Sequence, residues 1–281
     1  MRTVVFLTDR VRPHGTADDH LALAPLRALG LQVDFRAWED AVPDPTVSAW
    51  VIRSPWNYAQ AAPAFLERLA ALGPLFNPIE VVRWNADKRY LLELAEAGVP
   101  IIPSFLAPRA ALADAVDSTG WEEVVVKPCV SAGGVGVRRV NAVNVFTEEA
   151  FGGLPEGDYL VQPFLDDVTD SGEVSCVFFG GEFSHAVRKT AADGNFLVHE
   201  EHGGRVEFVV PDTTVIDESR AALVAAGSTD LPYARVDWIE TERGPKLVEL
   251  ELLEPELFFR AHPLAPERFA AALAGLLGGP R

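Results

Sequence analysis

The sequence contains few cysteines and has a shortage of basic residues. Its two cysteines among 281 residues, Cys129 and Cys176, lack metal-ligand spacing and are too few for a disulfide framework. Lys and Arg number 24 against 41 Asp and Glu, which gives a formal net charge of −17. A surface that follows phosphate groups needs a basic excess. The composition therefore argues against a disulfide-rich secreted domain and predicts no nucleic-acid partner.

Long hydrophobic runs are also missing. No stretch approaches the ~20 uninterrupted apolar residues of a membrane span, so no membrane partner is expected. The apolar start of the chain ends at Asp9 and Arg10, which predicts a first strand rather than a signal peptide. Hydrophobic residues make up 48% of the chain and charged residues 23%, as in folded globular proteins. We expect a cytoplasmic protein with reduced thiols and a homodimeric assembly.

Strand-like and helix-like segments alternate, which predicts the α/β class. In the first third the predicted strands cover residues 4–7, 31–35 and 50–53. Helices are expected after a cap at Asp18 or Asp19, around Leu69, and over residues 85–98. The rest is richer in strands, which are predicted at 124–127, 135–140, 159–162, 174–179, 183–188, 206–210, 234–240 and 246–252. Helices are predicted over residues 215–226 and 266–277.

A glycine-bearing segment at 131–136 lies between two predicted strands, and Lys127 ends the first of them. It lacks the third glycine of a dinucleotide fingerprint and the Gly-Lys-Ser/Thr ending of a P-loop. One interpretation is a flap that folds over a polyphosphate and uses backbone N–H groups of Ser131, Gly133 and Gly134 as donors. The other interpretation is a plain hairpin turn.

Three acidic residues occupy two apolar strands near the C-terminal end of the sequence. Strand periodicity places Glu249 and Glu251 on one face, and a hairpin at residues 243–244 brings Asp237 beside them. Buried carboxylates repel one another unless cations compensate. Because hard oxygen ligands suit Mg²⁺, these acids are candidate metal ligands; a solvent-facing row of acids is the alternative.

The order of these features resembles the ATP-grasp superfamily over most of the chain. That superfamily has an N-terminal α/β domain, two phosphate-binding lysines, a glycine flap, a hinge strand that binds adenine, and an acidic metal site. The matching positions here are Lys88, Lys127, the flap at 131–136, the hinge Gln162, Pro163, Phe164 and Leu165, and the acids Asp237, Glu249 and Glu251.

Within the superfamily the chain is most similar to glutathione-synthetase-like ligases, and there to the O-ureido-serine cyclo-ligase branch. The segments that carry this similarity are 53–56, 82–84, 87–90, 183–186 with Lys189, 235–237, 249–251 and 254–255. The sequence departs from the pattern at Glu251, where glutathione synthetase and D-alanine ligases usually have Asn. The extra negative charge would tighten a divalent-cation site or pair with Arg235.

The resemblance implies an ATP-grasp fold with an N-terminal pre-ATP-grasp domain at 1–84, a small subdomain with the flap at 85–165, and a large subdomain with the metal site at 166–281. It also implies ATP and two Mg²⁺ ions as cofactors. Lys88 and Lys127 would neutralise phosphates, and Arg235, Arg188 and Lys189 are the catalytic candidates. An acid after the hinge, Asp166, Asp167 or Glu173, would accept the ribose hydroxyls.

Other positions are candidates for substrate binding. Arg53 and Ser54 follow a predicted strand end, where they would bind a carboxylate or form a surface ion pair. His185 is either a substrate contact or a structural histidine. The long polar stretch 189–205 is either a lid over the site or a surface loop.

The resemblance implies an ATP-dependent ligase that activates a small, amino-acid-like carboxylate as an acyl phosphate and joins it to a nitrogen nucleophile. Its expected partners are thus a small-molecule carboxylate and an amine. Two alternatives remain open: ring closure within one O-ureido-serine-like molecule, and a nucleotide-binding module without catalysis. The presence of both lysines and all three acids argues against the module.

Overall fold

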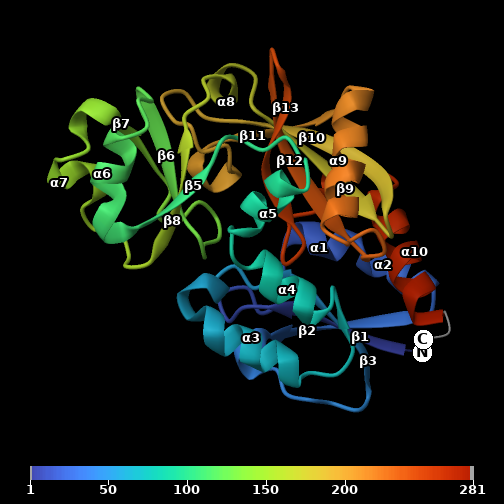
Figure 1. Ribbon diagram of the computed structural model, residues 1–281. Coiled ribbons are helices and arrows are strands. Elements are labelled where there is room, and N and C mark those ends of the chain that lie inside the picture. Colours follow the sequence, from blue (N-terminus) through green and yellow to red (C-terminus); the bar gives the residue numbers. More distant parts are fainter. Residues whose placement is uncertain (1, 279–281) are drawn as a thin grey trace.

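The computed structural model describes residues 2–278 and contains three sheets (Figure 1). The N-terminal sheet is parallel and has the order β2-β1-β3-β4. Its strands are β1 (Arg2–Thr8), β2 (Leu31–Ala37), β3 (Val47–Ser54) and β4 (Leu75–Phe76). The helices of this unit are α1 (Ala17–Leu21), α2 (Leu23–Ala28) and α3 (Ala62–Ala71). The predicted strands and the helix around Leu69 are confirmed here.

The helix expected after Asp18 or Asp19 begins one turn earlier and is divided into α1 and α2. Thr16 is the N-cap, and its hydroxyl accepts from the Asp19 backbone N–H while the Asp19 carboxylate accepts from the Thr16 backbone N–H. This reciprocal capping box satisfies two donors at once. Asp19 is therefore the third helical position rather than the cap.

The second sheet is antiparallel and has the order β5-β8-β6-β7. It comprises β5 (Phe105–Pro108), β6 (Glu123–Pro128), β7 (Arg138–Asn141) and β8 (Asp158–Pro163), with α6 (Leu112–Asp117) and α7 (Glu148–Phe151). We call this the flap unit, because the loop 129–137 joins β6 to β7. Strand β5 and helices α6 and α7 were not predicted, because they are short and weakly patterned. Strand β7 begins three residues later than predicted, because the flap glycines extend to Gly136.

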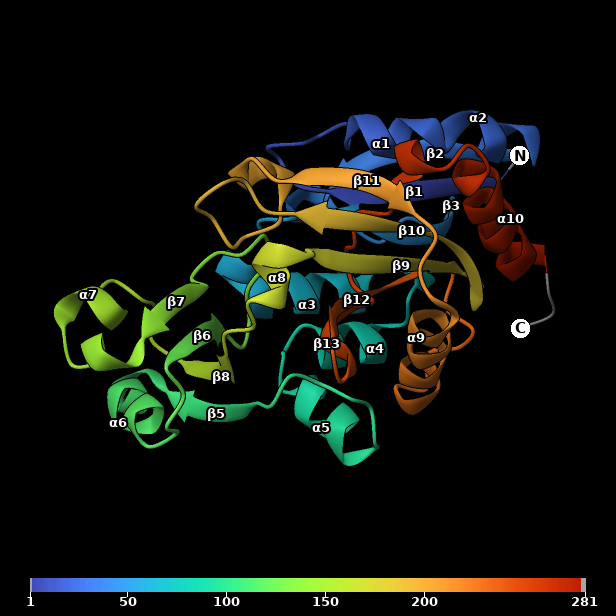
Figure 2. The same cartoon turned by 90° about the horizontal axis from the view of Figure 1, so that it is seen from above.

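The large sheet is antiparallel, with the order β11-β10-β9-β12-β13. Its strands are β9 (Glu173–Phe179), β10 (Glu182–Thr190), β11 (Arg205–Val209), β12 (Ala234–Thr241) and β13 (Gly244–Glu251). Helix α9 (Thr213–Ala225) covers one face (Figure 2). Helix α10 (Ala265–Gly278) packs at the other face, where Phe269 contacts Phe179 of β9 and Phe6 of β1. This packing joins the N-terminal sheet to the large sheet through one core.

The predicted helix over 85–98 is in fact interrupted. Helix α4 (Ile79–Asn85) ends before Lys88, and α5 (Tyr90–Glu96) begins after it. The Lys88 backbone N–H donates to the Cys129 carbonyl at 2.8 Å, outside any helical pattern. The interruption fixes Lys88 against the base of the flap, so a break that periodicity does not reveal positions a predicted phosphate ligand.

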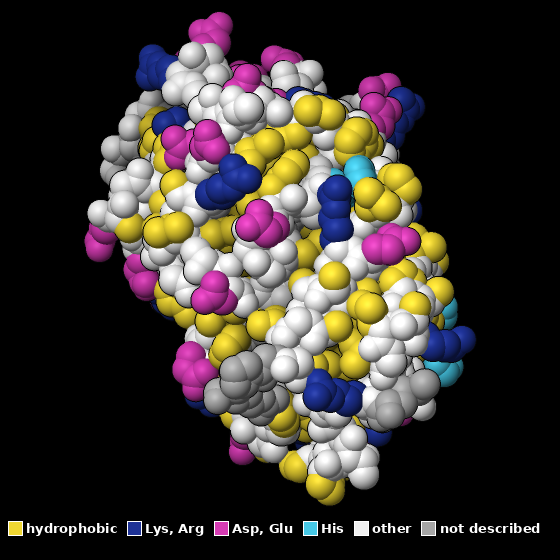
Figure 3. All heavy atoms as spheres, turned by 90° about the vertical axis from the view of Figure 1, so that its right-hand side faces the viewer, with side chains coloured by type: hydrophobic (Ala, Val, Ile, Leu, Met, Phe, Trp, Pro, Cys, Tyr) yellow, Lys and Arg dark blue, Asp and Glu magenta, His cyan; other side chains and the backbone are white. Residues whose placement is uncertain are grey.

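The surface bears on the predicted partners. Lys and Arg side chains lie among acidic and apolar ones on the face drawn in Figure 3. Within residues 2–278 no helix is long and apolar enough to cross a membrane.

Both cysteines are buried free thiols, and burial raises the pKa of Cys129 to about 11 and that of Cys176 to about 12.

Candidate active site

A cavity of about 510 Å³ lies where the three sheets meet. The N-terminal unit contributes Arg12, Trp56 and Tyr58, and the flap unit contributes Lys127, residues 131–135 and the hinge 162–165. The large sheet supplies six charged side chains: Glu173 of β9, Lys189 of β10, Arg235 and Asp237 of β12, and Glu249 and Glu251 of β13. The loop 191–204 between β10 and β11, which we call the lid, contributes residues 196–201. Segments far apart in the sequence thus converge on one site.

The acidic residues reach the cavity through the register of β12 and β13. Asp237 lies opposite Glu249, and Arg235 lies opposite Glu251. Residues two apart on a strand share a face, so all four side chains lie on the same side of the sheet. The predicted juxtaposition of Asp237 with Glu249 and Glu251 is therefore present in the register.

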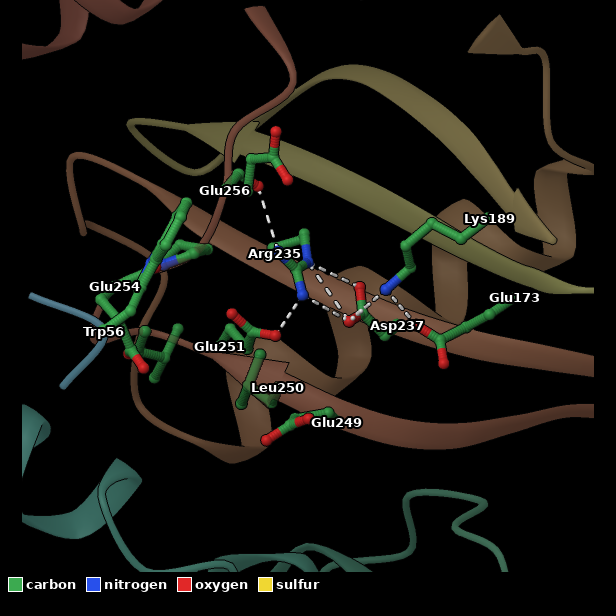
Figure 4. Close-up of polar contacts among 12 residues, drawn as sticks. Trp56, Glu173, Lys189, Arg235, Asp237, Glu249, Leu250, Glu251, Glu254 and Glu256 are labelled. Atoms are coloured by element: carbon green, nitrogen blue, oxygen red, sulfur yellow. Dashed lines mark hydrogen bonds and ion pairs between the residues drawn. The ribbon is translucent and has the colours of Figure 1, made fainter. Parts of the chain in front are cut away.

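Arg235 lies between two of these carboxylates (Figure 4). Its guanidinium donates to both Asp237 oxygens at 2.9 Å and also pairs with Glu251. Lys189 donates to Asp237 Oδ2 at 3.1 Å and pairs with Glu173. Burial alone would raise the pKa of Asp237, but Arg235 and Lys189 hold that pKa well below its usual range. The two cations thus favour the ionised form of Asp237.

The same contacts bear on metal binding. Among residues 2–278 no three His, Cys, Asp or Glu side chains are already arranged around a common point, since Arg235 and Lys88 occupy oxygens of the acids. The donor chemistry nevertheless fits Mg²⁺, because all three acids offer hard oxygens on one face. Burial raises the pKa of Glu251 to about 8 despite Arg235, with further contributions from Glu249 and Asp237. A divalent cation would relieve this repulsion.

The two predicted phosphate lysines differ in their surroundings. Lys88 pairs with Glu249 at 3.0 Å and donates to the Ser131 carbonyl at 3.0 Å. Lys127 makes no ion pair with any described residue, and burial lowers its pKa. A desolvated cation without a partner is costly. Lys127 is therefore suited to an anion that the chain itself does not supply.

An apolar slot adjoins the hinge. Ile102, Ile239 and Val248 form a buried cluster with the partly buried Leu165 and Val168, and all five line the cavity. Beside it, Phe164 lies under the Arg139 guanidinium at 3.6 Å from the ring centroid and meets Phe196 of the lid edge to face. A flat apolar slot beside backbone polar groups has the form of a site for a heterocyclic base.

The lid lies against the flap and the N-terminal unit. A Cβ on Gly134 would lie 3.5 Å from the His199 ring, so lid and flap are in near contact. Glu200 pairs with Arg260, and Glu201 lies 3.9 Å from Arg12. These contacts place the stretch predicted as a lid over the cavity rather than away from it.

Three comparisons with known proteins agree with this geometry. The family described as D-cycloserine synthetase DcsG, N-terminal domain, matches residues 4–77. The cycloserine biosynthesis protein DcsG of Streptomyces lavendulae is 33% identical over 98% of this chain and 98% of its own length. The chain belongs to the DcsG family of ATP-grasp ligases.

Solved structures extend the comparison. The crystal structure of D-cycloserine synthetase DcsG matches 98% of this chain and 99% of its own with a TM-score of 0.86 and 30% identity. A D-alanine–D-alanine ligase from Bacillus anthracis has the same fold, with a TM-score of 0.66 at 14% identity over 99% of this chain and 97% of its own. A probable alpha-L-glutamate ligase of Aliivibrio fischeri is 27% identical over 66% of this chain and 62% of its own length. The ATP-grasp fold, and an ATP-dependent ligase that forms C–N bonds, are thereby confirmed.

The site predictions for this family member divide into two groups. The lining of the cavity includes the following predicted residues: Lys88, Lys127, Ser131, Gly133, Gly134, Gln162, Pro163, Phe164, Leu165, Glu173, Lys189, Arg235, Asp237, Glu249 and Glu251. Their individual roles stay predictions. Arg53, Ser54, His185 and Arg188 do not line the cavity.

The four outlying residues have structural partners instead. Arg188 pairs with Glu240, because Lys189, its neighbour on β10, takes the inward-facing position. His185 bonds to the Leu257 carbonyl at 3.0 Å, and burial lowers its pKa to about 4. Ser54 lies beside Asp19, which also holds Arg53. Glu173, one of three ribose candidates, pairs with Lys189.

Arg53 is 2% exposed and holds two parts of the fold together. Its Nε donates to Asp19 at 2.9 Å, and its Nη1 donates to the Pro255 carbonyl at 3.2 Å. The expectation that Arg53 binds a substrate carboxylate is not supported by this placement. The side chain instead fixes the loop 254–256 at the edge of the cavity.

Replacing Arg53 by Ala is expected to destabilise the fold by about 3–5 kcal/mol, because it leaves the buried Asp19 carboxylate without its cation. Urea denaturation followed by circular dichroism measures the change. Arg10→Ala is the matched control, since the Arg10–Asp40 pair is exposed and its loss should leave the midpoint unchanged. A wild-type midpoint for R53A combined with a raised KM for the carboxylate would restore the substrate role.

A second prediction concerns the flap. Gly136 has φ +76°, and a Cβ there would lie 2.7 Å from Pro128 Cγ, just after Lys127. Gly136→Ala should therefore raise the KM for ATP about tenfold, as expected for losing one to two backbone hydrogen bonds to phosphate. Gly153→Ala is the control, since Gly153 has φ +72° with nothing near its Cβ position. Equal KM values for the two variants would contradict the flap assignment.

Sequence reasoning missed several lining residues. Arg12, Tyr58 and Glu256 lie in the cavity, as do Ile102, Val168, Ile239 and Val248 of the slot. Ile239 and Val248 lie in predicted strands, but nothing in the sequence marked them as part of a binding site. Arg12 belongs to no sequence motif. The Asp9 carboxylate accepts from the Arg12 backbone N–H and from its side chain, at 2.8 Å each, and these bonds hold Arg12 toward the cavity.

Proposed function

We propose that this ligase activates the carboxylate of a small amino-acid-like substrate with ATP and then closes a ring within the same molecule, on an O-ureido-serine-like substrate. In the first step a carboxylate oxygen attacks the γ-phosphorus of ATP, and ADP leaves. In the second step a nitrogen of the substrate attacks the acyl carbon, the C–N bond forms, and inorganic phosphate departs as the nitrogen releases a proton. Each step has a stable leaving group.

The nucleotide is held between the flap unit and the large sheet. The adenine lies in the slot of Ile102, Ile239 and Val248, with backbone groups of the hinge 162–165 at its edge. Lys88 and Lys127 would neutralise the phosphate chain, and the backbone N–H groups of Ser131, Gly133 and Gly134 would donate to its oxygens.

Asp237, Glu249 and Glu251 would hold Mg²⁺, for which we propose two ions. When bound, Mg²⁺ supplies charge neutralisation to the phosphate oxygens during transfer. Arg235 lies on the same face of the sheet, and it binds the substrate carboxylate and then steadies the negative charge that develops on its oxygens. Lys189 keeps Asp237 ionised.

The lid serves the second step. An acyl phosphate hydrolyses if water reaches it, and the lid residues 196–201 close the cavity toward solvent. Exclusion of water favours a nitrogen that is already tethered to the same molecule, because its effective concentration is high.

The observation that carries the proposal is the convergence of Lys88, Lys127, Arg235 and three carboxylates on one cavity. Ring closure, rather than joining of two molecules, is supported by the whole-length similarity to a protein of cycloserine biosynthesis. The probable glutamate ligases match about two thirds of the chain, which makes intermolecular ligation the second candidate.

Product analysis separates the two candidates. The chain is incubated with Mg²⁺, ATP and O-ureido-serine, without a second amine, and products are followed by mass spectrometry and ADP release. The proposal predicts a cyclic product formed with one ADP per molecule. ADP release that requires an added amino acid, with a linear product, would replace ring closure by intermolecular ligation; no ADP with any carboxylate would refute both.

A further inference from the structure

One acidic side chain of the cavity forms no ion pair among the described residues. Eight Asp and Glu residues line the cavity, and seven of them pair with Arg or Lys among the described residues. Glu254 is the exception within residues 2–278. It follows β13 and lies beside Trp56, on the side of Arg235 away from Lys189 (Figure 4).

The loop that carries Glu254 is fixed in place by three donors from two units. Trp56 Nε1 donates to the Glu254 carbonyl, Arg53 Nη1 to the Pro255 carbonyl and Arg235 Nη1 to the Glu256 carbonyl, each at 3.2 Å. A side chain on a loop anchored in this way is preorganised, since little conformational freedom remains to be lost on binding.

Tyr58 completes the surroundings of Glu254. Tyr58 is 4% exposed, lines the cavity and lies close to Glu254. Burial and the nearby Glu249 raise the pKa of Glu254 to about 7. Lys88 and Arg235 lie near enough to oppose this rise in pKa, but their ion pairs go to Glu249, Asp237 and Glu251. A half-buried carboxylate that forms no ion pair of its own is stabilised by an incoming cation.

Two charged side chains that line the cavity, Lys127 and Glu254, form no ion pair among the described residues and come from different parts of the fold. Lys127 lies on β6 of the flap unit, whereas Glu254 lies beside Trp56 of the N-terminal unit. Arg235, which the proposed function assigns to the reacting carboxylate, donates to the Glu256 carbonyl of the loop that carries Glu254.

We infer that Glu254, aided by the Tyr58 hydroxyl, binds the α-ammonium group of the substrate and makes the enzyme selective for α-amino acids over other carboxylates. This inference rests on the proposed function. In an α-amino acid the ammonium is one carbon away from the carboxylate. A substrate carboxylate held at Arg235 therefore directs its ammonium toward the loop that Arg235 itself anchors.

The test compares two probes that differ in one group: O-ureido-serine and its analogue with a hydroxyl in place of the α-amino group. Glu254→Gln keeps the size of the side chain and the Trp56 hydrogen bond. It should lower kcat/KM about 10–100-fold for the amino compound, the effect of losing a hydrogen-bonded charge, and change the hydroxy analogue less than about threefold. The loss should be in KM rather than kcat.

Two further variants refine the comparison. Tyr58→Phe should reduce the same preference in part. Glu256→Gln is the matched control on the same loop, because Glu256 already pairs with Arg260 at 2.5 Å, and it should leave the amino-over-hydroxy ratio at the wild-type value. An equal fall of both probes in E254Q, or a fall in kcat alone, would overturn the inference and assign Glu254 to the chemical step.

A binding measurement keeps the two proposals distinguishable. Calorimetry is performed with both probes on wild-type and E254Q protein loaded with Mg²⁺ and a non-hydrolysable ATP analogue. Preferential binding of the amino compound, lost in E254Q, supports the inference even if turnover fails and the proposed reaction is wrong. Equal binding of both probes to the wild-type protein contradicts the inference even if ADP is released.

Discussion

Replacing Glu249 by glutamine is expected to lower the rate of ADP formation by at least about 10²-fold, the scale seen when one stabiliser of transition-state charge is removed. The amide keeps the volume of the side chain but not the negative charge that a divalent ion requires. Steady-state ADP release at saturating ATP measures the effect, and titration with Mg²⁺ should show a raised requirement for the ion.

The control for this variant lies on the same strand pair. Glu242 is exposed in the turn between β12 and β13, so E242Q changes the net charge equally without touching the cavity. Its turnover should equal that of the wild-type protein. Normal turnover and a normal Mg²⁺ requirement in E249Q would remove Glu249 from the proposed metal ligands.

Replacing Lys127 by alanine is expected to separate stability from binding. Lys127 has no ion pair in the described part of the chain, and burial lowers its pKa, so its removal relieves a desolvated charge and should not reduce Tm. The Kd for Mg²⁺-ATP should rise about 10–100-fold, because a charge-assisted contact to phosphate is lost. Calorimetry and thermal denaturation on the same sample measure both quantities.

Lys246→Ala supplies the comparison for that result. Lys246 lies on β13 but does not line the cavity, and its replacement should leave the Kd for ATP unchanged. An unchanged Kd in K127A would show that Lys127 does not contact phosphate. A large drop in Tm would instead assign Lys127 a structural role.

Much of the fold could be predicted because the long strands carry clear periodicity. The register of Asp237 opposite Glu249 followed from strand alternation and a glycine turn, both of which are local signals. The break before Lys88 was not predictable, because residues 85–98 have continuous helical spacing and the interruption arises from a tertiary bond between the Lys88 N–H and Cys129.

For the site too, residues marked by local sequence signals could be predicted, whereas residues placed by tertiary contacts could not. Residues embedded in motifs, such as Lys127 and the hinge, were found because their neighbours in the sequence identify them. Arg53 was misread because a strand end in an α/β unit is a common ligand position, whereas its partners Asp19 and Pro255 are 34 and 202 residues away. Glu254 was noted only as part of a resemblance, since the absence of an ion pair at its carboxylate among the described residues is a property of the packed cavity.

The most direct test of the account follows an oxygen atom. A substrate carrying ¹⁸O in both carboxylate oxygens is incubated with the enzyme, Mg²⁺ and ATP, and the released phosphate is analysed by mass spectrometry. Activation through an acyl phosphate predicts that the phosphate carries one ¹⁸O atom and that ADP is the nucleotide product. Unlabelled phosphate, or release of AMP and pyrophosphate, would contradict the account.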